Sequence, residues 1–474
     1  MGFKHFGNKW MMLLLVCSMF FGGQGAWAFS SGEHAVIGDE ALKLANPEFA
    51  HNIKGLEAKI HYTYGQLVAL SGDFFKNVER LAFEDPSVLS EFHGRNREGL
   101  KKCIDEEVHA IRTEQVYGGC GEMKLMQKRV NYVALAHDNY SHFAWHNIKL
   151  YVEEHTRALW FAQLAHLKCD RHQWDMTPKL CQKNEETLHR LVDASHYRNK
   201  LKAKYRRLPE LFPRKRFTKR YLKEMPKEKL IRTALFTNAF ADHFLTDAFS
   251  SGHMRVPRSQ IDEFVKNNAL IQSDEREKGS SISGALTQFL HNLDGTLTGL
   301  PVTNSLGHQF VSRSDKQLFS KMGSDQLSGI VEKNPQLKLP LQAAHQSLNE
   351  VFAVIKNGTS AMPSGEYVAL RYVPFIQQGK APSLVEVVKQ RMASEGGTQD
   401  VIDTMSNEMQ LIFRGRLAIR DKNTGSYKSY FDAFVEALPD MMAQFRAQIE
   451  AEAHSDSLQT RIPPKLLQAL KSIN

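Results

Sequence analysis

Apolar residues recur every three or four positions along most of this chain, the spacing that places them on one face of an α-helix. Alternating apolar and polar residues, which would predict strands, are scarce. Up to about residue 320, the pattern predicts helices at Glu33–Ala45, Ile60–Phe75, Met123–Phe143, Ile148–Leu167, Lys229–Phe249 and Ile282–Leu293. Further on it predicts helices at Leu341–Lys356, Leu384–Met392, Gln399–Phe413 and Tyr430–Ala453, with a looser stretch at Asn357–Ser383. The pattern therefore predicts an all-α protein.

The first 28 residues have the organisation of a secretory signal peptide. Lys4 and Lys9 give a positive start, Trp10–Phe21 is an apolar core of twelve residues, and Ala26-Trp27-Ala28 fits an A-x-A cleavage site. An apolar run of this length is too short to span a bilayer as a helix. We therefore expect cleavage after this site, a mature chain that begins at Phe29, and a secreted or periplasmic protein.

Four cysteines follow the predicted cleavage site: Cys103, Cys120, Cys169 and Cys181. An even number of cysteines in an exported protein favours disulfide bonds. Proximity in sequence favours Cys103–Cys120 and Cys169–Cys181 among the three possible connectivities. Four free thiols or a cysteine-rich metal site are the alternatives, although no two cysteines have C-x-x-C spacing.

Basic residues are concentrated in one segment of a chain whose formal net charge is +9. Arg198–Lys229 contains fourteen Lys and Arg residues against three acidic residues, with Tyr and Phe interleaved. Such a segment attracts anionic lipid or nucleic acid. A solvated loop and helix face without a ligand is the simpler interpretation, so charge alone does not identify a partner.

The segment from Leu235 to His253 contains the most informative motif in the chain. His243, Asp247 and His253 follow the pattern H-x3-D-x5-H. The first two are four residues apart in a predicted helix and therefore share a face. Ser250-Ser251-Gly252 would end that helix and let His253 return to the same pocket. Imidazole and carboxylate are zinc ligands, so the motif predicts a metal site with Asp247 shared between two ions. An isolated H-x3-D pair would more often be a surface pair.

Other segments supply residues of the same ligand types. His34 lies five residues after Phe29, whose α-amine would be free after cleavage, and Asp73 and His142 lie at the ends of predicted helices. His291 and Asp294 are three residues apart and can share a helix face. Each of these residues alone would more often be structural, but together they would complete three metal sites.

With these motifs, the chain resembles the bacterial zinc-dependent phospholipases C, which share an all-helical, three-zinc fold with fungal single-strand nucleases. The resemblance rests on the H-x3-D-x5-H motif, on Phe29 with His34, and on Ser141-His142-Phe143 with Asp73 upstream. The stretch HNLDGTLTGLPVTN resembles the longer, exported branch of these phospholipases. The resemblance covers about residues 29–320. It therefore implies a signal peptide at 1–28, a catalytic domain at 29–320 and a mainly helical extension at 321–474.

The resemblance implies which residues hold each metal ion. The first ion would take Asp73, His142, His243 and Asp247, and the second would take the amine and carbonyl of Phe29, His34 and the shared Asp247. The third ion would take His253, with His291 and Asp294 as the best fit for the remaining ligands. Two departures affect this assignment: 69 residues separate Asp73 from His142, and the last pair is H-x2-D where the family has H-x3-E or H-x3-D.

The chemistry implied is phosphodiester hydrolysis of phosphatidylcholine-like lipids to diacylglycerol and a phosphorylated headgroup. Zinc would bind phosphate oxygens and activate water, with Asp73 both as a ligand and as the general base. Aromatic residues near the ligands could frame a choline cation or an acyl chain, although core packing is their commoner role (Phe74, Phe143, Trp145, Phe244 and Phe249). We expect a monomer that acts on phospholipid membrane surfaces, with no nucleic-acid partner. The alternatives are a secreted zinc nuclease or 3′-nucleotidase, and a non-catalytic membrane-binding effector.

Overall fold

The structure is a computed structural model that describes residues 30–46, 62–72, 95–113, 139–169, 177–195, 219–268, 276–314, 335–394, 396–397, 399–402, 410, 418–420 and 427–474. In these parts the chain is mostly helical, which confirms the predicted all-α class. None of the described helices is both long enough and apolar enough to cross a membrane.

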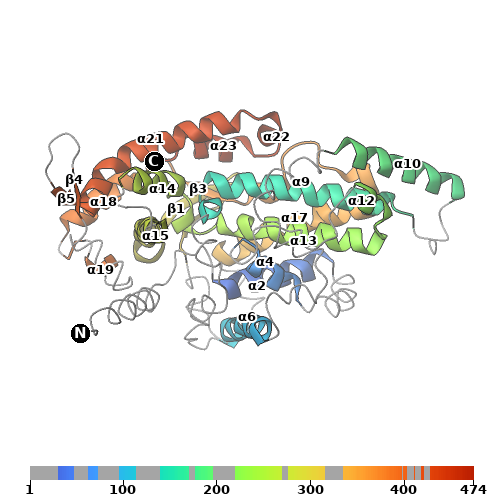
Figure 1. Ribbon diagram of the computed structural model, residues 1–474, viewed down its shortest axis with the longest axis horizontal. Helices are drawn as coiled ribbons and strands as arrows, with labels where there is room; N and C mark the ends of the chain where they lie inside the picture. Colours follow the sequence, from blue (N-terminus) through green and yellow to red (C-terminus); the bar gives the residue numbers. More distant parts are fainter. Residues whose placement is uncertain are drawn as a thin grey trace, which may run out of the picture.

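Three long helices form the centre of the molecule: α9 (Trp145–Leu167), α13 (Lys227–Asp247) and α17 (Pro335–Asn357). Their axes are nearly aligned in Figure 1, and α13, which runs opposite to α9, packs against both of the others. Sixteen residues of α13 are buried, on every face of its second half. A helix that is buried all round lies in the core of a large domain, and its polar residues then need partners inside the protein.

Three further helices cover one side of this centre: α2 (Ser31–Ala45), α4 (Tyr64–Leu70) and α6 (Arg95–Thr113) (Figure 1). Helices α2 and α4 approach closely because Gly65 has no side chain. A Cβ atom there would lie 1.9 Å from the carbonyl oxygen of Ala35. The Gly65 amide instead donates to Asp39 at 2.7 Å. This close contact brings the start of α2 and the end of α4 to the same end of α13.

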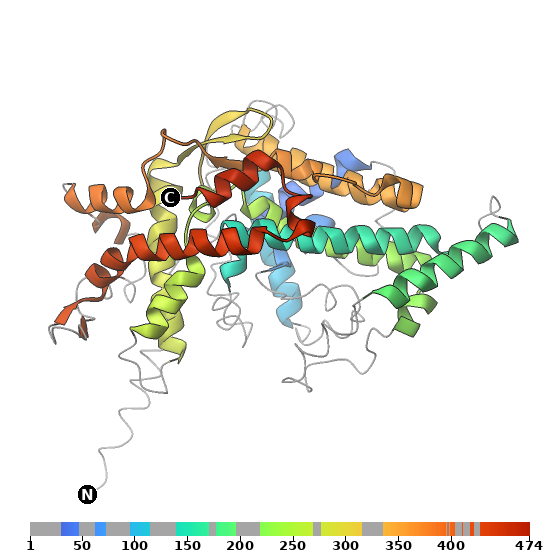
Figure 2. The same cartoon turned by 90° about the horizontal axis from the view of Figure 1, so that it is seen from above.

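The remaining helices surround this centre. They are α10 (Pro178–Ala194), α12 (Lys219–Glu224), α14 (Arg258–Asn267), α15 (Arg276–Asn292), the π-helical η5 (Leu293–Thr298), α18 (Leu384–Ala393), α19 (Gln399–Ile402), α21 (Tyr430–Ala453), α22 (Asp456–Gln459) and α23 (Pro464–Lys471). Short helical turns occur at η2 (Asn139–His142), η4 (Ser251–His253), η6 (Gly358–Ala361) and η7 (Val368–Arg371). Figure 2 shows α21 beside the start of α9, where Trp145 Nε1 donates to Glu452 at 2.9 Å.

Five short strands were not predicted. The strands β1 (Leu300–Asn304), β2 (Gln309–Ser312) and β3 (Pro374–Ile376) form an antiparallel sheet in the order β2-β1-β3. The strands β4 (Ala418–Arg420) and β5 (Tyr427–Ser429) form a hairpin. Because β3 pairs with β1 and α17 packs on α9 and α13, the segment beyond residue 321 packs directly on the first part of the chain.

The predicted helices are reproduced with different ends. The helices predicted in α2, α9, α13, α15, α17, α18 and α21 are present. The one predicted at Ile60–Phe75 is the shorter α4, and of Gln399–Phe413 the structure describes α19 and residue 410. Most of Met123–Phe143 lies outside the described residues, and its final part is the 3-10 turn η2.

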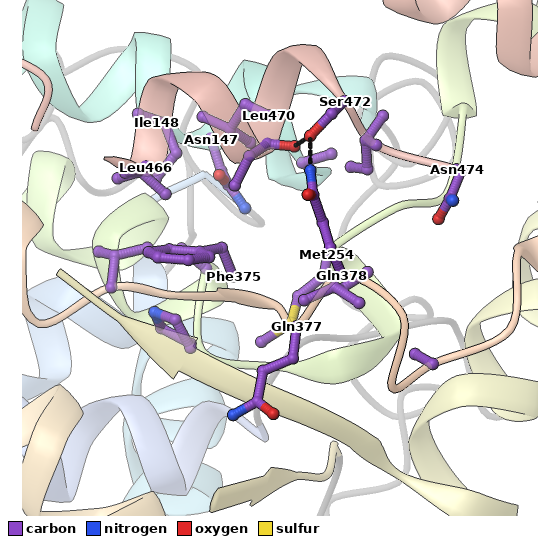
Figure 3. A pocket seen from close by; sticks show the side chains of 18 of the residues that line it. Asn147, Ile148, Met254, Phe375, Gln377, Gln378, Leu466, Leu470, Ser472 and Asn474 are labelled. Atoms are coloured by element: carbon purple, nitrogen blue, oxygen red, sulfur yellow. Dashed lines mark hydrogen bonds between the residues drawn. The ribbon is translucent and has the colours of Figure 1, made fainter. Parts of the chain in front are cut away.

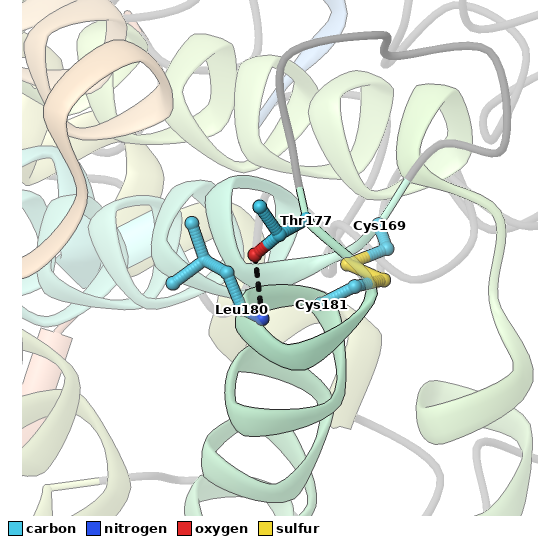
Figure 4. The surroundings of a disulfide bond; sticks show 4 residues. All are labelled: Cys169, Thr177, Leu180 and Cys181. Atoms are coloured by element: carbon cyan, nitrogen blue, oxygen red, sulfur yellow. Dashed lines mark hydrogen bonds between the residues drawn. A yellow bond between two sulfur atoms is a disulfide. The ribbon is translucent and has the colours of Figure 1, made fainter.

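The predicted disulfide between Cys169 and Cys181 is present (Figure 4). It joins the second residue after α9 to the first turn of α10, with a Cα–Cα distance of 5.7 Å. The Thr177 hydroxyl caps α10 by accepting from the Leu180 amide at 3.3 Å. The other predicted pair cannot be compared, because Cys120 and the side chain of Cys103 lie outside the described part of the chain.

Removing this disulfide should lower the free energy of unfolding by about 3 kcal/mol, because it closes a short loop in the unfolded chain. The double variant Cys169→Ser/Cys181→Ser tests this in urea unfolding. Under reducing conditions the parent protein and the double variant should unfold at the same urea concentration, which is the matched control. Equal unfolding midpoints for the oxidised parent and the double variant would contradict the prediction.

Candidate metal centre

Helix α13 and the turn that follows it bring the three residues of the motif together. His243 and Asp247 lie on one face of the last turns of α13. The chain then bends, with the Ser250 amide donating to the Asp247 carbonyl and the His253 amide to the Ser250 carbonyl, both at 3.0 Å. The 3-10 turn η4 carries His253 back toward the end of the helix. The predicted helix break and return are therefore observed.

Three histidines from three different elements surround the carboxylate of Asp247. His142 Nδ1 lies 2.7 Å from Asp247 Oδ2, and His243 Nε2 lies 3.6 Å from the same oxygen. His34 Nε2 lies 3.4 Å from Oδ1. His243 Nε2 and His142 Nδ1 are 3.2 Å apart. The ligand atoms of His34, His243 and Asp247 all lie within 4.8 Å of one another, close enough to share a metal ion.

Hydrogen bonds fix how three of the imidazoles present their nitrogens. His243 Nδ1 lies 2.9 Å from the carbonyl of Val68, and His253 Nδ1 lies 2.7 Å from the carbonyl of His142. A carbonyl only accepts, so Nδ1 carries the proton in both rings. His34 Nδ1 lies 2.8 Å from the Thr246 hydroxyl, whose own proton goes to backbone carbonyls of α13. Each ring therefore offers the lone pair of Nε2, the arrangement found around histidine-bound metals.

Burial determines the charge of this cluster. It lowers the pKa of His243 and of His253 well below the ordinary histidine value, so both rings are neutral at pH 7. Burial raises the pKa of Asp247, but His243 and His142 outweigh that effect and hold the pKa well below its usual range. The site thus combines the neutral imidazoles of His243 and His253 with the buried anionic carboxylate of Asp247. Metal binding needs these protonation states, and a cation would balance the buried charge.

Local structure places His34 and His142. Ser30 and Glu33 form a capping box at the start of α2, which fixes His34 in the first turn of the helix. His142 ends η2, two residues before Ala144, whose φ of 48° is rare for a residue with a side chain. The Ala144 amide donates to the carbonyl of His253 at 2.6 Å. This strained residue therefore joins the segment of His142 to the turn that carries His253.

A second pair of imidazoles lies beside the first cluster. The ring centroids of His253 and His291 are 5.2 Å apart, and His253 Nε2 is buried with no hydrogen-bond partner among the described residues. Gly252 makes the approach possible, because a Cβ atom there would lie 2.2 Å from the His291 ring. Phe143 stacks on the His253 ring at 4.2 Å between centroids. A buried, unpartnered imidazole nitrogen fits a metal ligand.

Asp294, predicted as a ligand of the third ion, pairs with Arg255 in the structure. Both of its oxygens accept from Arg255 at 2.7 Å, and both side chains are buried. This bidentate pair holds the carboxylate in one orientation. The role of Asp294 as a metal ligand stays a prediction. Arg255 lies two residues beyond the motif, but nothing local in the sequence identified this pairing.

Two of the predicted ligands lie outside the described residues: Phe29 and Asp73. Their immediate neighbours Ser30 and Gly72 are described. Gly72 has a φ of 75°, and a Cβ atom there would lie 2.8 Å from His243 Nε2 and 2.9 Å from His142 Cε1. The chain thus enters the cluster at Gly72, one residue before the carboxylate predicted as ligand and base.

The aromatic residues near the motif are core residues, with exposed fractions of 0% to 3% (Phe143, Trp145, Phe244 and Phe249). Phe244 packs against His142 and His243 at 5.0 and 5.1 Å between ring centroids. Phe74 lies outside the described residues. The described aromatic residues therefore support the histidines, as expected for core packing, and do not form an exposed cage for a choline cation.

A second polar cluster on α13 explains why Asp242 is not part of the metal centre. Its oxygens accept from Ser347 at 2.6 Å, from Tyr64 at 2.7 Å and from Asn238 at 3.1 Å. Burial raises the pKa of Asp242 to about 7, although Ser347 and Tyr64 act to lower it. This carboxyl group is satisfied by neutral donors. It therefore joins α4, α13 and α17, whereas Asp247 faces the imidazoles.

The buried histidines should make the metal-free protein less stable in mild acid. Below about pH 6.5, the unfolded chain binds a proton at His253 that the folded protein excludes, so acid favours unfolding. Asp242, with its raised pKa, acts in the opposite direction, and a variant must therefore be compared with its parent. His253→Gln should flatten the fall in the free energy of unfolding by about 1.4 kcal/mol per pH unit between about pH 6.5 and pH 5.

Urea unfolding of both metal-free proteins across this interval measures the difference in slope. Circular dichroism at pH 7 controls for a native fold in the variant. Parallel pH profiles would contradict the prediction, because they would mean that His253 takes up its proton equally in the folded and unfolded states.

Comparisons of this chain with known protein families, characterised proteins and solved structures found no match. The assignment of the site therefore rests on its own geometry and chemistry. Imidazole nitrogens and one carboxylate are a zinc-type donor set, and the ligand atoms of His34, His243 and Asp247 lie close enough together to hold a metal ion.

Proposed function

We propose that this protein is an exported, zinc-dependent phospholipase C that hydrolyses phosphatidylcholine-like lipids to diacylglycerol and a phosphorylated headgroup. One observation carries the proposal: three segments distant in sequence bring three imidazoles around the buried carboxylate of Asp247. The H-x3-D-x5-H motif that contains His243 and Asp247 resembles that of the zinc phospholipases C. The predicted signal peptide and the disulfide agree with export.

The residues of the site have separate roles in this proposal. His34, His142, His243 and Asp247 would hold zinc, with Asp247 shared between two ions, and His253 with His291 would hold a third. Bound zinc would polarise a phosphoryl oxygen and lower the pKa of a water molecule to about 7. Val68, Thr246 and the His142 carbonyl keep the imidazoles oriented. Asp73 would accept the proton of the attacking water, and Phe29 would contribute its terminal amine.

The proposed substrate is a phospholipid in a membrane surface, and the proposed protein is a monomer. The basic segment Arg198–Lys229 would attract an anionic surface, although most of it lies outside the described residues. A nuclease built on a similar zinc centre would use the same chemistry on nucleic acid. The substrate therefore has to be tested directly.

The test compares both substrates with the zinc-loaded protein at about 0.15 M salt, where exposed charges are screened beyond about 8 Å. We expect release of phosphocholine from phosphatidylcholine vesicles and no cleavage of single-stranded DNA or RNA. Treatment with a chelator should abolish the release, and added zinc should restore it. Efficient cleavage of nucleic acid with intact vesicles would replace this proposal with a nuclease.

A further inference from the structure

A cavity of about 230 Å³ lies between the start of α9, the segment of β3 and helix α23 (Figure 3). Part of its wall is formed by Ala144, Ala248 and Met254. Ala248 directly follows Asp247, Met254 directly follows His253, and Ala144 lies two residues after His142. The rest of the wall comes from residues 373–379 and 381, and from Leu466, Ala469, Leu470 and residues 472–474 in and after α23. For scale, an apolar cavity of about 150 Å³ is large enough to bind benzene. This cavity therefore has room for a larger organic molecule.

The wall of this cavity selects for an uncharged ligand. Large apolar side chains line it, including Ile148, Phe375, Leu466 and Leu470. None of the residues that the structure describes around it has a charged side chain. Moving a charged group into such surroundings without a partner is costly, whereas burying an aliphatic chain is favourable. A free phosphate or a carboxylate is a poor match to this wall.

Asn147 provides the polar contact inside the cavity. Its side chain is 1% exposed, and its Nδ2 donates to the carbonyl of His142 at 3.1 Å. That bond fixes the orientation of the amide, because a carbonyl cannot accept from Oδ1. Oδ1 has no hydrogen-bond partner among the described residues. Figure 3 shows the amide above Phe375, near Ile148 and Leu470. A buried acceptor without a partner points to a ligand that donates a hydrogen bond.

The cavity meets solvent at its other end. There, Gln378 Nε2 donates to Ser472 Oγ at 2.8 Å, and both residues are exposed (Figure 3). The amide of Gln377 is already used, because it donates to the carbonyl of Val302 at 3.1 Å. The cavity thus has exposed polar residues at its rim and the buried acceptor of Asn147 in its wall.

We propose that this cavity is a binding site for a neutral aliphatic alcohol, whose hydroxyl donates to Asn147 Oδ1 while its chain packs on Phe375, Leu466 and Leu470. This inference does not depend on the proposed reaction. A free long-chain alcohol and an acylglycerol share the required chemistry, an uncharged hydroxyl on an aliphatic chain.

Isothermal titration calorimetry with 1-octanol, on the full protein as purified, tests the site. We expect saturable binding with a negative heat-capacity change, and at least tenfold weaker binding of octanoate at pH 7. Ala469→Trp, which fills the cavity from α23, should weaken 1-octanol binding at least tenfold. Gln468→Trp adds the same side chain at the exposed neighbouring position and should leave binding unchanged.

A second cavity-filling variant keeps the test decisive if Ala469→Trp does not fold. Ala381→Leu narrows the cavity from the segment after β3 and should also weaken binding, while circular dichroism reports the fold of each variant. The same titration with 1-octanoylglycerol shows whether the natural ligand is an acylglycerol or a free long-chain alcohol. Tighter binding than that of 1-octanol identifies an acylglycerol, and weaker binding identifies a free alcohol. Absence of binding of both, equal affinity for octanoate, or full affinity in both filling variants would overturn the proposal.

Discussion

Replacing Asp247 by Asn should reduce the proposed phosphodiesterase activity at least about 100-fold and remove the proposed zinc. Residues that only orient metal ligands typically contribute 10- to 100-fold, so a shared ligand should contribute more. The carboxylate lies within 3.6 Å of three imidazole nitrogens and is the one acidic group between them among the described residues. Asparagine keeps the shape but lacks the negative charge. Turnover and elemental zinc analysis measure the effect.

Asp262→Asn is the matched control for this substitution. Asp262 is also a largely buried acid paired with a cation, since it accepts from Arg258 at 2.6 Å, but it lies outside the imidazole cluster. We expect this variant to lose stability while it keeps its zinc content and turnover. If both variants kept zinc and turnover, the assignment of the H-x3-D-x5-H motif as a metal site would be wrong.

The part of the site that sequence could predict is the part encoded locally. Four-residue spacing in an apolar helix places His243 and Asp247 on one face whatever the tertiary structure. Ser250 and Gly252 signal the turn that returns His253. The position of His34 in the first turn of α2 follows from the capping box of Ser30 and Glu33, which is also readable from sequence. Three of the residues that these local signals place, His34, His243 and Asp247, therefore lie together in the observed centre.

Features that depend on distant segments were missed. The strand β1 pairs with β3, a segment about seventy residues later. Its five residues alternate in burial, but they include Pro301, and a proline in a short run argues against a strand in the sequence. Arg255 and Asp294 pair across 39 residues. No local pattern in the sequence shows that the carboxylate of Asp294 is paired with an arginine. Helix α10 is different, because its Thr177 cap followed by Pro178 is a usable signal that the periodicity alone did not capture.

Replacing Arg255 by Met should lower the free energy of unfolding by about 3–5 kcal/mol, because it leaves the buried charge of Asp294 without a partner. Arg255 is fully buried, and its Nη1 also donates to the carbonyl oxygen of Pro382 at 2.6 Å and to that of Asn474 at 3.2 Å. The guanidinium thus joins the turn after the motif to η5 and to two segments of the extension. Urea unfolding should show the loss, and the second change Asp294→Leu should recover part of it.

Zinc content separates the two interpretations of Asp294. If it is the ion-pair partner of Arg255, Asp294→Asn and Arg255→Met should both be less stable than the parent, and both should keep the parent's zinc content. If it were instead a ligand of a third ion, Asp294→Asn would lose one zinc ion and Arg255→Met would not. Because both Asp294 oxygens face Arg255 at 2.7 Å, we expect the first result. It would leave His253 and His291 to hold any third ion without this carboxylate.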